Sequence, residues 1–586
     1  MALSALAGLG LPVLAGCDLP GASKDKGGSA SRSGSTAGGS ATTSASAPAK
    51  AGSTEWQKLD GHVMGHKVSV EVSPVVRQDD KSSYIAVKLT RASDDASIDA
   101  VKASSYKDDS GNKLSISNYL GAGPFRAGTG ASLVKLLDTS SGRVWSAVDG
   151  SGLFLELAPG EDMTSYLSFG KVDTDTVTVM VPMAGFTTVS VLDANDAKKA
   201  KIDLSIAQAA LKQSSHAVPE LADPVAIERY TRALDDSTST HAGGKDITVT
   251  LASDVTFASD SADLAPGAEA QLQTVATQLG QHPDGGTLTI VGHTDDVQDD
   301  AYNQTLSEKR ANAVKTRLEQ LTKLDKWKTS VSGKGESQPK IKDTTDQARA
   351  ANRRVEITLT PTGGTTAQKA APSTGTLPEA KGPVAKGPDG VTVTVDGSKD
   401  QVTITLDHVI RTGGYLLGQV QTTTRATKNS IHNFDQWLED KEMYHLNSRG
   451  EDASAGITEF AADGLTLLAG NERIYPADYL DAEFKAHVPL TELGLIPSIK
   501  AGTITVCVVW PDPGGHTVTL DHAAPRKEIS DYAYRLTDIP VKNSRQCKGG
   551  EVGHELKTAP QRNAHNREDA MRRRDFTDNR NLRSLD

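Results

Sequence analysis

The sequence predicts a multidomain α+β protein in which a central α/β sandwich is flanked by two β-sandwich domains. Apolar residues alternate between frequent turn signals in residues 54–200 and again in residues 391–548. Strand and helix patterns take turns through residues 245–361, as expected for helices packed on a sheet. The chain has 586 residues, a length that favours three or four domains of roughly 150 residues each.

Composition excludes several classes of protein. Lys and Arg number 63 against 74 Asp and Glu, a net charge of −11, which argues against a whole-chain nucleic-acid binder. Only 37% of the residues are hydrophobic, and no internal run approaches the ~20 apolar residues that span a bilayer. The 3 cysteines exclude a disulfide-dense scaffold and a multi-cysteine zinc protein. We expect no cofactor, no metal site and no nucleic-acid partner.

The first residues have the features of an export signal. Residues 1–16 form an uncharged apolar run that fits a secretory h-region and is too short to span a membrane. Leu14-Ala15-Gly16-Cys17 resembles the bacterial lipoprotein box, which implies a signal peptide over 1–17 and lipidation of Cys17. An ordinary signal peptide with a chance cysteine is the alternative. Residues 18–53, rich in Gly, Ser, Ala and Thr, predict a disordered tether.

The two β-rich parts resemble each other. The run Val68–Arg77 matches Val402–Arg411 in its apolar pattern, and a Tyr-led strand follows each run at Tyr84 and Tyr415. This indicates an internal repeat, although alternation recurs by chance as easily as by shared ancestry.

The remaining segments separate the domains. Asp223-Pro224 is typical of a helix start, so residues 201–244 are predicted as a helical connector. Residues 362–390, rich in Pro, Gly, Thr and Ala, predict a linker. Residues 549–586 carry charges of both signs and predict a disordered tail.

Two cysteines form a candidate disulfide. Cys507 lies in the apolar strand Thr503–Trp510, and Cys547 lies in a polar stretch near the tail. Outside the cytosol such a pair tends to oxidise. The bridge would close a loop of about 40 residues and stabilise the fold by ~3–4 kcal/mol. A buried free Cys507 with an exposed Cys547 is the alternative.

One predicted helix of the central domain carries a charged residue on its apolar face. Its predicted second helix, from about Gln304 to Leu321, has an apolar stripe that includes Leu306 and Val314. Arg310 lies on this stripe, where a charged residue needs a partner or a route to water. The preceding strand breaks at Gly292 and runs into a loop that carries Asp295, which is the obvious partner region.

Four runs in the central domain resemble the motifs of the OmpA-like peptidoglycan-binding domain. They are Phe257–Leu264, Gly292–Val314, Gly335–Pro339 and Ala350–Ile357. The resemblance implies a βαβαβ sandwich that grips the diaminopimelate of peptidoglycan stems. Asp295 matches the family residue that holds the ammonium, and Arg310 matches the one that holds the carboxylate, as charge-assisted hydrogen bonds.

Other positions of the motifs carry less weight. Thr294, Asn303 and Arg353 match residues that line or brace the family's pocket. Ala258 stands where the family often has an acid, and Val297-Gln298 replaces commoner small residues, which puts secondary contacts in doubt. His293 is predicted to be structural, and Arg354 to be a solvated strand residue.

The sequence therefore predicts a non-catalytic, lipid-anchored protein that binds peptidoglycan and tethers the membrane to the wall. Envelope proteins are expected partners of the flanking domains. Ig-like flanks and an Ala/Gly/Thr/Ser-rich style resemble actinobacterial lipoproteins, which implies the outer face of the cell membrane. The outer membrane, facing the periplasm, is the alternative location. A wall-metabolising enzyme that uses the central domain for targeting is the alternative function, although no G-x-S-x-G or HExxH motif occurs.

Overall fold

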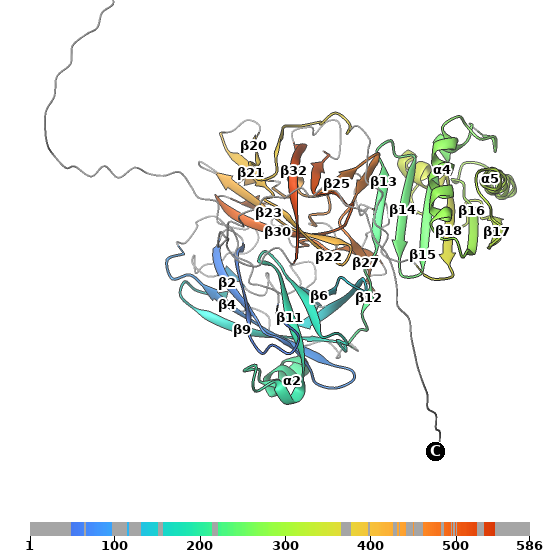
Figure 1. The fold of residues 1–586 in the computed structure, drawn as a ribbon. Helices are drawn as coiled ribbons and strands as arrows, with labels where there is room; N and C mark the ends of the chain where they lie inside the picture. The colour runs from blue at the N-terminus through green and yellow to red at the C-terminus, as the bar shows by residue number, and fades with distance from the viewer. Residues whose placement is uncertain are drawn as a thin grey trace, which may run out of the picture. The chain divides into compact units, whose positions relative to one another are not determined.

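The computed structural model contains a mixed α/β domain and two strand-rich regions (Figure 1). It describes residues 49–63, 66–95, 114–115, 131–149, 156–213, 221–258, 260–364, 377–395, 399–425, 431–432, 434–440, 449, 461–481, 486–493, 495, 498–499, 501–523 and 532–544. The predicted lipidation site Cys17, the tether up to residue 48, Cys547 and the charged tail lie outside these residues. Within the described part of the chain, no helix is long and apolar enough to cross a membrane.

The first strand-rich region runs from residue 57 to residue 193. Its strands are β1 (Gln57–Val63), β2 (His66–Val72), β3 (Val75–Arg77), β4 (Ser83–Arg91), β5 (Leu114–Ser115), β6 (Ala131–Asp138), β7 (Arg143–Asp149), β8 (Glu156–Leu157), β9 (Asp162–Phe169), β10 (Thr176–Val181) and β11 (Gly185–Asp193). Strand β2 alternates buried and more exposed residues, so Val68, Val70 and Val72 face the core as the sequence predicted.

The second strand-rich region begins after the central domain. Its elements are β19 (Val384–Lys386), β20 (Val391–Thr394), β21 (Gln401–Thr405), β22 (Val409–Thr412), β23 (Tyr415–Arg425), β24 (Ile431–His432), η2 (Phe434–Trp437), β25 (Thr466–Ala469), β26 (Glu472–Ile474), β27 (Asp478–Leu480), β28 (His487–Pro489), β29 (Ser498–Ile499), β30 (Ala501–Pro511), β31 (Thr517–His522) and β32 (Tyr534–Asn543). Strand β19 lies within residues 362–390, which were predicted as a linker. This part of the segment is a strand because it pairs in parallel with β32.

The two strand-rich regions have the same topology. In the first, the strand order is β1-β2-β4-β3-β11-β10-β6-β7, and in the second it is β20-β21-β23-β22-β32-β31-β25-β26. Both orders contain one parallel pair at the same place, β3 with β11 and β22 with β32. Strands β9 and β30 pair with the equivalent strands β4 and β23. The repeat seen in the sequence thus extends to the whole pairing scheme, while an Ig-like assignment stays a prediction.

The segment before the central domain differs from its prediction. A helix, α2 (Leu204–Gln213), follows the short η1 (Ala194–Asp196), but the stretch after Pro224 is extended. It forms β12 (Val225–Ala226) and β13 (Arg229–Ala233), which join β7 and β26 respectively. The prediction of a helix here was wrong because the segment pairs as strands: β13 forms a hairpin with β14, and β7 and β26, far away in the sequence, pair with β12 and β13, so each strand-rich region gains one strand.

The central domain is an α/β sandwich of the predicted kind. Its elements are β14 (Thr238–Gly243), β15 (Asp246–Ala252), α3 (Ser253–Thr256), α4 (Ala268–Gly280), β16 (Gly286–Gly292), α5 (Asp300–Leu321), β17 (Trp327–Gly333), α6 (Asp346–Asn352) and β18 (Arg354–Pro361). The sheet order is β17-β16-β18-β15-β14, with β16 and β17 parallel. Helix α5 packs on β16 and β17, and α4 packs on α5 (Figure 1).

Cys507 is a free thiol among the described residues, and its predicted partner Cys547 lies outside them, so the disulfide stays a prediction. The residue lies fully buried in β30, and its Sγ is 3.5 Å from the carbonyl oxygen of Val181 in the first region. Beside it, the Glu492 carboxylate accepts a 2.7 Å hydrogen bond from the backbone N–H of Met183. Burial raises the pKa of Glu492 to about 8.

We expect Glu492 to make the protein less stable as the pH rises. The pKa of the Glu492 carboxyl is 4.5 in the unfolded chain and about 8 in the folded protein. Between these pH values the folded state therefore keeps a proton that the unfolded chain releases. The stability contributed by this proton is complete below pH 4.5 and is lost as the pH rises to about 8. The loss amounts to roughly 3–5 kcal/mol.

Replacing the carboxyl by an amide tests this. Glu492→Gln keeps an oxygen for the Met183 N–H, so its melting temperature should rise relative to wild type between pH 5 and pH 8, as followed by calorimetry. Glu379→Gln, at an exposed position, is the matched control and should track wild type. A Glu492→Gln profile parallel to that of wild type would show that Glu492 is ionised in the folded protein.

Candidate functional site

A pocket of about 410 Å³ opens in the central domain, between the loop after β16, the first turns of α5 and the segment around α3. All five residues predicted to bind or brace a ligand line it: Thr294, Asp295, Asn303, Arg310 and Arg353. The remaining wall includes two further acids, Asp254 and Asp260, and two aromatic residues, Phe257 and Tyr302. Three carboxylates and two guanidinium groups therefore surround one small space.

Helix α5 positions Arg310 because it packs very closely on the sheet. Its N-terminus is capped by Asp299, whose carboxylate accepts a 2.9 Å hydrogen bond from the N–H of Tyr302. At the end of β16, a Cβ on Gly292 would come within 2.1 Å of the carbonyl oxygen of Ser307. Only glycine permits this approach, which holds the middle of α5 against the strand ends and brings Arg310 to the pocket.

Arg310 is a buried cation. Its residue exposure is 5%, its guanidinium lies 5.1 Å from the centre of the Phe257 ring, and its Nε–H donates to the carbonyl oxygen of Ser261 at 2.9 Å. Within the described residues, no carboxylate forms an ion pair with it at 4 Å or less. Burial lowers the pKa of Arg310, which expresses the cost of holding this charge away from water. Such a cation can bind an incoming carboxylate strongly.

Asp295 lies opposite, in a chain of ion pairs. Its Oδ2 accepts a 2.6 Å hydrogen bond from Nη1 of Arg353, and its side chain is 13% exposed. Arg353 in turn donates from Nε and Nη2 to the two oxygens of Asp254, at 2.7 and 2.6 Å. The hydrogen bonds that Arg353 donates to Asp254 and Asp295 raise its pKa, and burial opposes this effect. Arg353 thus fixes the direction of Asp295 and has its own charge satisfied.

Asn303 braces the loop that carries Asp295. Its Nδ2 donates to the carbonyl oxygens of Asp295 and Gln298, at 3.2 and 3.1 Å, and to a carboxylate oxygen of Glu336 at 2.6 Å. The residue is 1% exposed, so it acts on the loop and offers little to a ligand. Thr294 differs, because its buried Oγ1 has no partner among the described residues and remains available beside the pocket.

His293 and Arg354, two further basic residues of the motifs, have different surroundings. His293 is buried, as expected of a structural residue, and burial lowers its pKa. Arg354 was predicted to be solvated, and this was wrong. It is 5% exposed and donates to Glu356 at 2.6 Å and to the carbonyl oxygens of Asn352 and Gln338. Because Arg354 is buried at the start of β18, its guanidinium replaces lost water with these acceptors.

Sequence reasoning missed several residues of the pocket. Asp254 lies in the short helix α3 and was not singled out, although its partner Arg353 was. Asp260 has a φ of 50° and lies within the Phe257–Leu264 run, which was the available signal. The stacking of Arg310 on Phe257 explains physically why an aromatic residue begins that run.

These features define a class of site: a pocket that presents a buried cation and a fixed carboxylate to a small group carrying both charges. Comparison with known proteins identifies the family of this domain. Residues 256–353 match the OmpA family, and this part of the chain is an OmpA family domain.

Curated relatives match the same part of the chain. "Outer membrane porin F" of Pseudomonas aeruginosa is 41% identical over 103 residues, which cover 18% of this chain and 29% of that protein. "Outer membrane protein A" of Escherichia fergusonii is 39% identical over 119 residues, covering 18% of this chain and 48% of that protein. The chain therefore spans less than half the length of these relatives. A solved structure, the peptidoglycan-associated lipoprotein from Burkholderia pseudomallei, is 30% identical, with 18% of this chain and 86% of that chain covered and a TM-score of 0.16.

We expect Asn303→Ala to loosen the Asp295 loop. The change removes one donor from three acceptors in a buried place, which costs roughly 1–3 kcal/mol. Asn312→Ala is the matched control, since Asn312 lies exposed on the same helix and its side chain donates to the carbonyl oxygen of Glu308 one turn earlier. Urea unfolding should show a lower midpoint for Asn303→Ala alone. Equal midpoints for the two variants would contradict the bracing role.

Proposed function

We propose that this protein binds peptidoglycan non-covalently through the diaminopimelate of the stem peptide. The observation that carries the proposal is the buried Arg310 guanidinium, which has no carboxylate partner among the described residues and faces the same pocket as Asp295. A fold keeps such a charge at a cost, and a ligand carboxylate is what compensates it.

Diaminopimelate fits this pocket by its chemistry. Its free end carries an ammonium and a carboxylate on one carbon. The carboxylate of the ligand would bind the Arg310 guanidinium, and its ammonium would bind the Asp295 oxygen that accepts no hydrogen bond from Arg353. Asp260 lines the same pocket. Lysine, which replaces diaminopimelate in other walls, has the ammonium without the carboxylate. The site should therefore discriminate between the two, because a buried cation left unpaired is costly.

The remainder of the proposal concerns attachment. Lipid on Cys17 would hold the membrane, residues 18–53 would act as the tether, and the central domain would hold the wall, so the protein joins membrane and wall without catalysis. The relatives named as outer membrane proteins support a place in the cell envelope. We place the protein on the outer face of the cell membrane, with envelope proteins as partners of the two strand-rich regions.

Replacing Arg310 by methionine separates binding from folding. Arg310→Met keeps an unbranched apolar side chain and removes the buried charge, so the melting temperature should stay level or rise. Co-sedimentation of the full-length chain with diaminopimelate-containing sacculi should weaken at least tenfold, since a hydrogen bond to a charged group contributes roughly 1.5–3 kcal/mol. Asp295→Asn should weaken binding as well.

Two controls accompany this experiment. Arg317→Met, on the same helix but ion-paired with Glu269 at the surface, should bind like wild type. Sacculi with lysine in the third stem position should bind wild type weakly. Equal sedimentation of Arg310→Met and Arg317→Met would refute the proposed site, and equal binding to both wall types would refute diaminopimelate as its ligand.

A further inference from the structure

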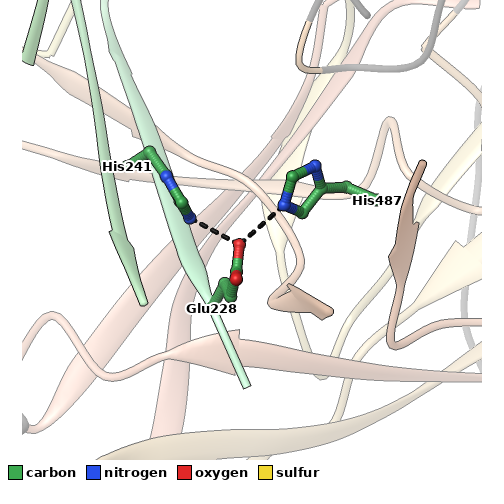
Figure 2. Close-up of side chains that lie close together, drawn as sticks. All are labelled: Glu228, His241 and His487. Atoms are coloured by element: carbon green, nitrogen blue, oxygen red, sulfur yellow. Dashed lines mark hydrogen bonds and ion pairs between the residues drawn. The ribbon is translucent and has the colours of Figure 1, made fainter. Parts of the chain in front are cut away.

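Three side chains outside the pocket converge on one point. Oε2 of Glu228 lies 2.5 Å from Nε2 of His241 and 2.7 Å from Nε2 of His487, as Figure 2 shows. Glu228 lies between β12 and β13, His241 lies in β14, and His487 begins β28 of the second strand-rich region. The two imidazole rings meet edge to face, with centres 5.5 Å apart.

The backbone holds each of these residues firmly. Glu228 exchanges two backbone hydrogen bonds with Asp478, at 2.7 and 3.1 Å. His241 is paired with Tyr230 on one side and Thr248 on the other, and His487 is paired with Leu480. A Cβ on Gly243 would lie 2.5 Å from Cγ of Glu228, so this glycine makes the room that lets the carboxylate reach His241.

We propose that Glu228, His241 and His487 form a binding site for a divalent transition-metal ion, with zinc as the best match. Two imidazole nitrogens and one carboxylate oxygen are a donor set that zinc favours, and the three atoms lie within 4.8 Å of one another. Ligand atoms around tetrahedral zinc lie about 3.3 Å apart at bonds of ~2.0–2.1 Å. The ion would take the place of the protons that now join Glu228 to each histidine, after these two Glu–His distances open by about 0.6–0.8 Å.

Partial burial suits such a site. The side chains of Glu228, His241 and His487 are 14%, 27% and 12% exposed, so the ion is shielded on the protein side and a water molecule can complete its shell.

The neighbouring charges are compatible with a cation. Arg449 lies 3.2 Å from Oε2 of Glu228, but its Nη1 also lies 3.3 Å from Asp478, which is buried. The negative charges of Glu228 and Asp478 thus offset the positive charges of Arg449 and the metal ion. Arg449 would act as an outer donor that orients the Glu228 carboxylate, as partners of ligating carboxylates commonly do.

Metal binding at this site would strengthen the contact between three parts of the chain. The three ligands come from the connecting segment, from the strand that leads into the wall-binding domain, and from the second strand-rich region. An ion that binds all three stabilises their contact by its binding free energy. This would matter to a protein that carries load between two layers of an envelope.

Zinc titration of the purified, untagged full-length chain tests the proposal. After removal of metals with a chelator and dialysis, calorimetric titration with ZnCl₂ should show one ion per chain and a higher melting temperature. Glu228→Gln and His487→Gln should bind on the order of 10–100-fold more weakly and lose the rise in melting temperature. His516→Gln, which changes an exposed histidine, should behave like wild type.

A third variant keeps the test decisive if the others unfold. His241→Cys retains a zinc ligand, so it should still bind, and with Co²⁺ in place of zinc it should gain a thiolate charge-transfer band that wild type lacks. A wild-type chain that binds no zinc would overturn the proposal. So would Glu228→Gln and His487→Gln variants that bind as tightly as wild type, or a His241→Cys complex without the thiolate band.

Discussion

The central domain depends on the placement of one guanidinium away from water. Arg310 is nearly buried, stacked on Phe257 and held by the carbonyl oxygen of Ser261, while the nearby carboxylates point elsewhere. Asp254 and Asp295 form ion pairs with Arg353, so among the described residues Arg310 is left without a carboxylate at ion-pair distance. This arrangement costs folding free energy and prepares the site for a ligand that brings both signs of charge.

The rest of the chain surrounds this domain with two versions of one strand arrangement. The strand orders of the two strand-rich regions match, including the position of the parallel pairs β3–β11 and β22–β32. Strands β12 and β13 extend one region each, immediately before the chain enters the central domain. Glu228 lies between these two strands, which is why its contacts with His241 and His487 connect three parts of the sequence.

Local patterns predicted much of this, and long-range contacts account for what they missed. The apolar stripe around Arg310 and the strand break at Gly292 indicated the pocket, because periodicity and motif spacing are local properties. The helix expected after Pro224 failed because Arg229–Ala233 forms a hairpin with β14 and also pairs with β26, a distant strand that no local pattern reveals. The Asp254–Arg353 pair spans 99 residues, and the histidine–glutamate cluster spans still more, so neither was accessible to spacing arguments. Cys507 was predicted to pair with Cys547, which lies outside the described residues, so that pairing stays a prediction.

The most direct measurement is a crystal structure of the full-length chain with diaminopimelate bound. The account predicts that one carboxylate of the ligand lies within hydrogen-bonding distance of the Arg310 guanidinium and that the ammonium on the same carbon contacts Asp295. The Arg353–Asp254 pair should remain as it is, because it positions Asp295 and does not need the ligand. A ligand bound with Arg310 still unpaired, or bound outside this pocket, would contradict the account.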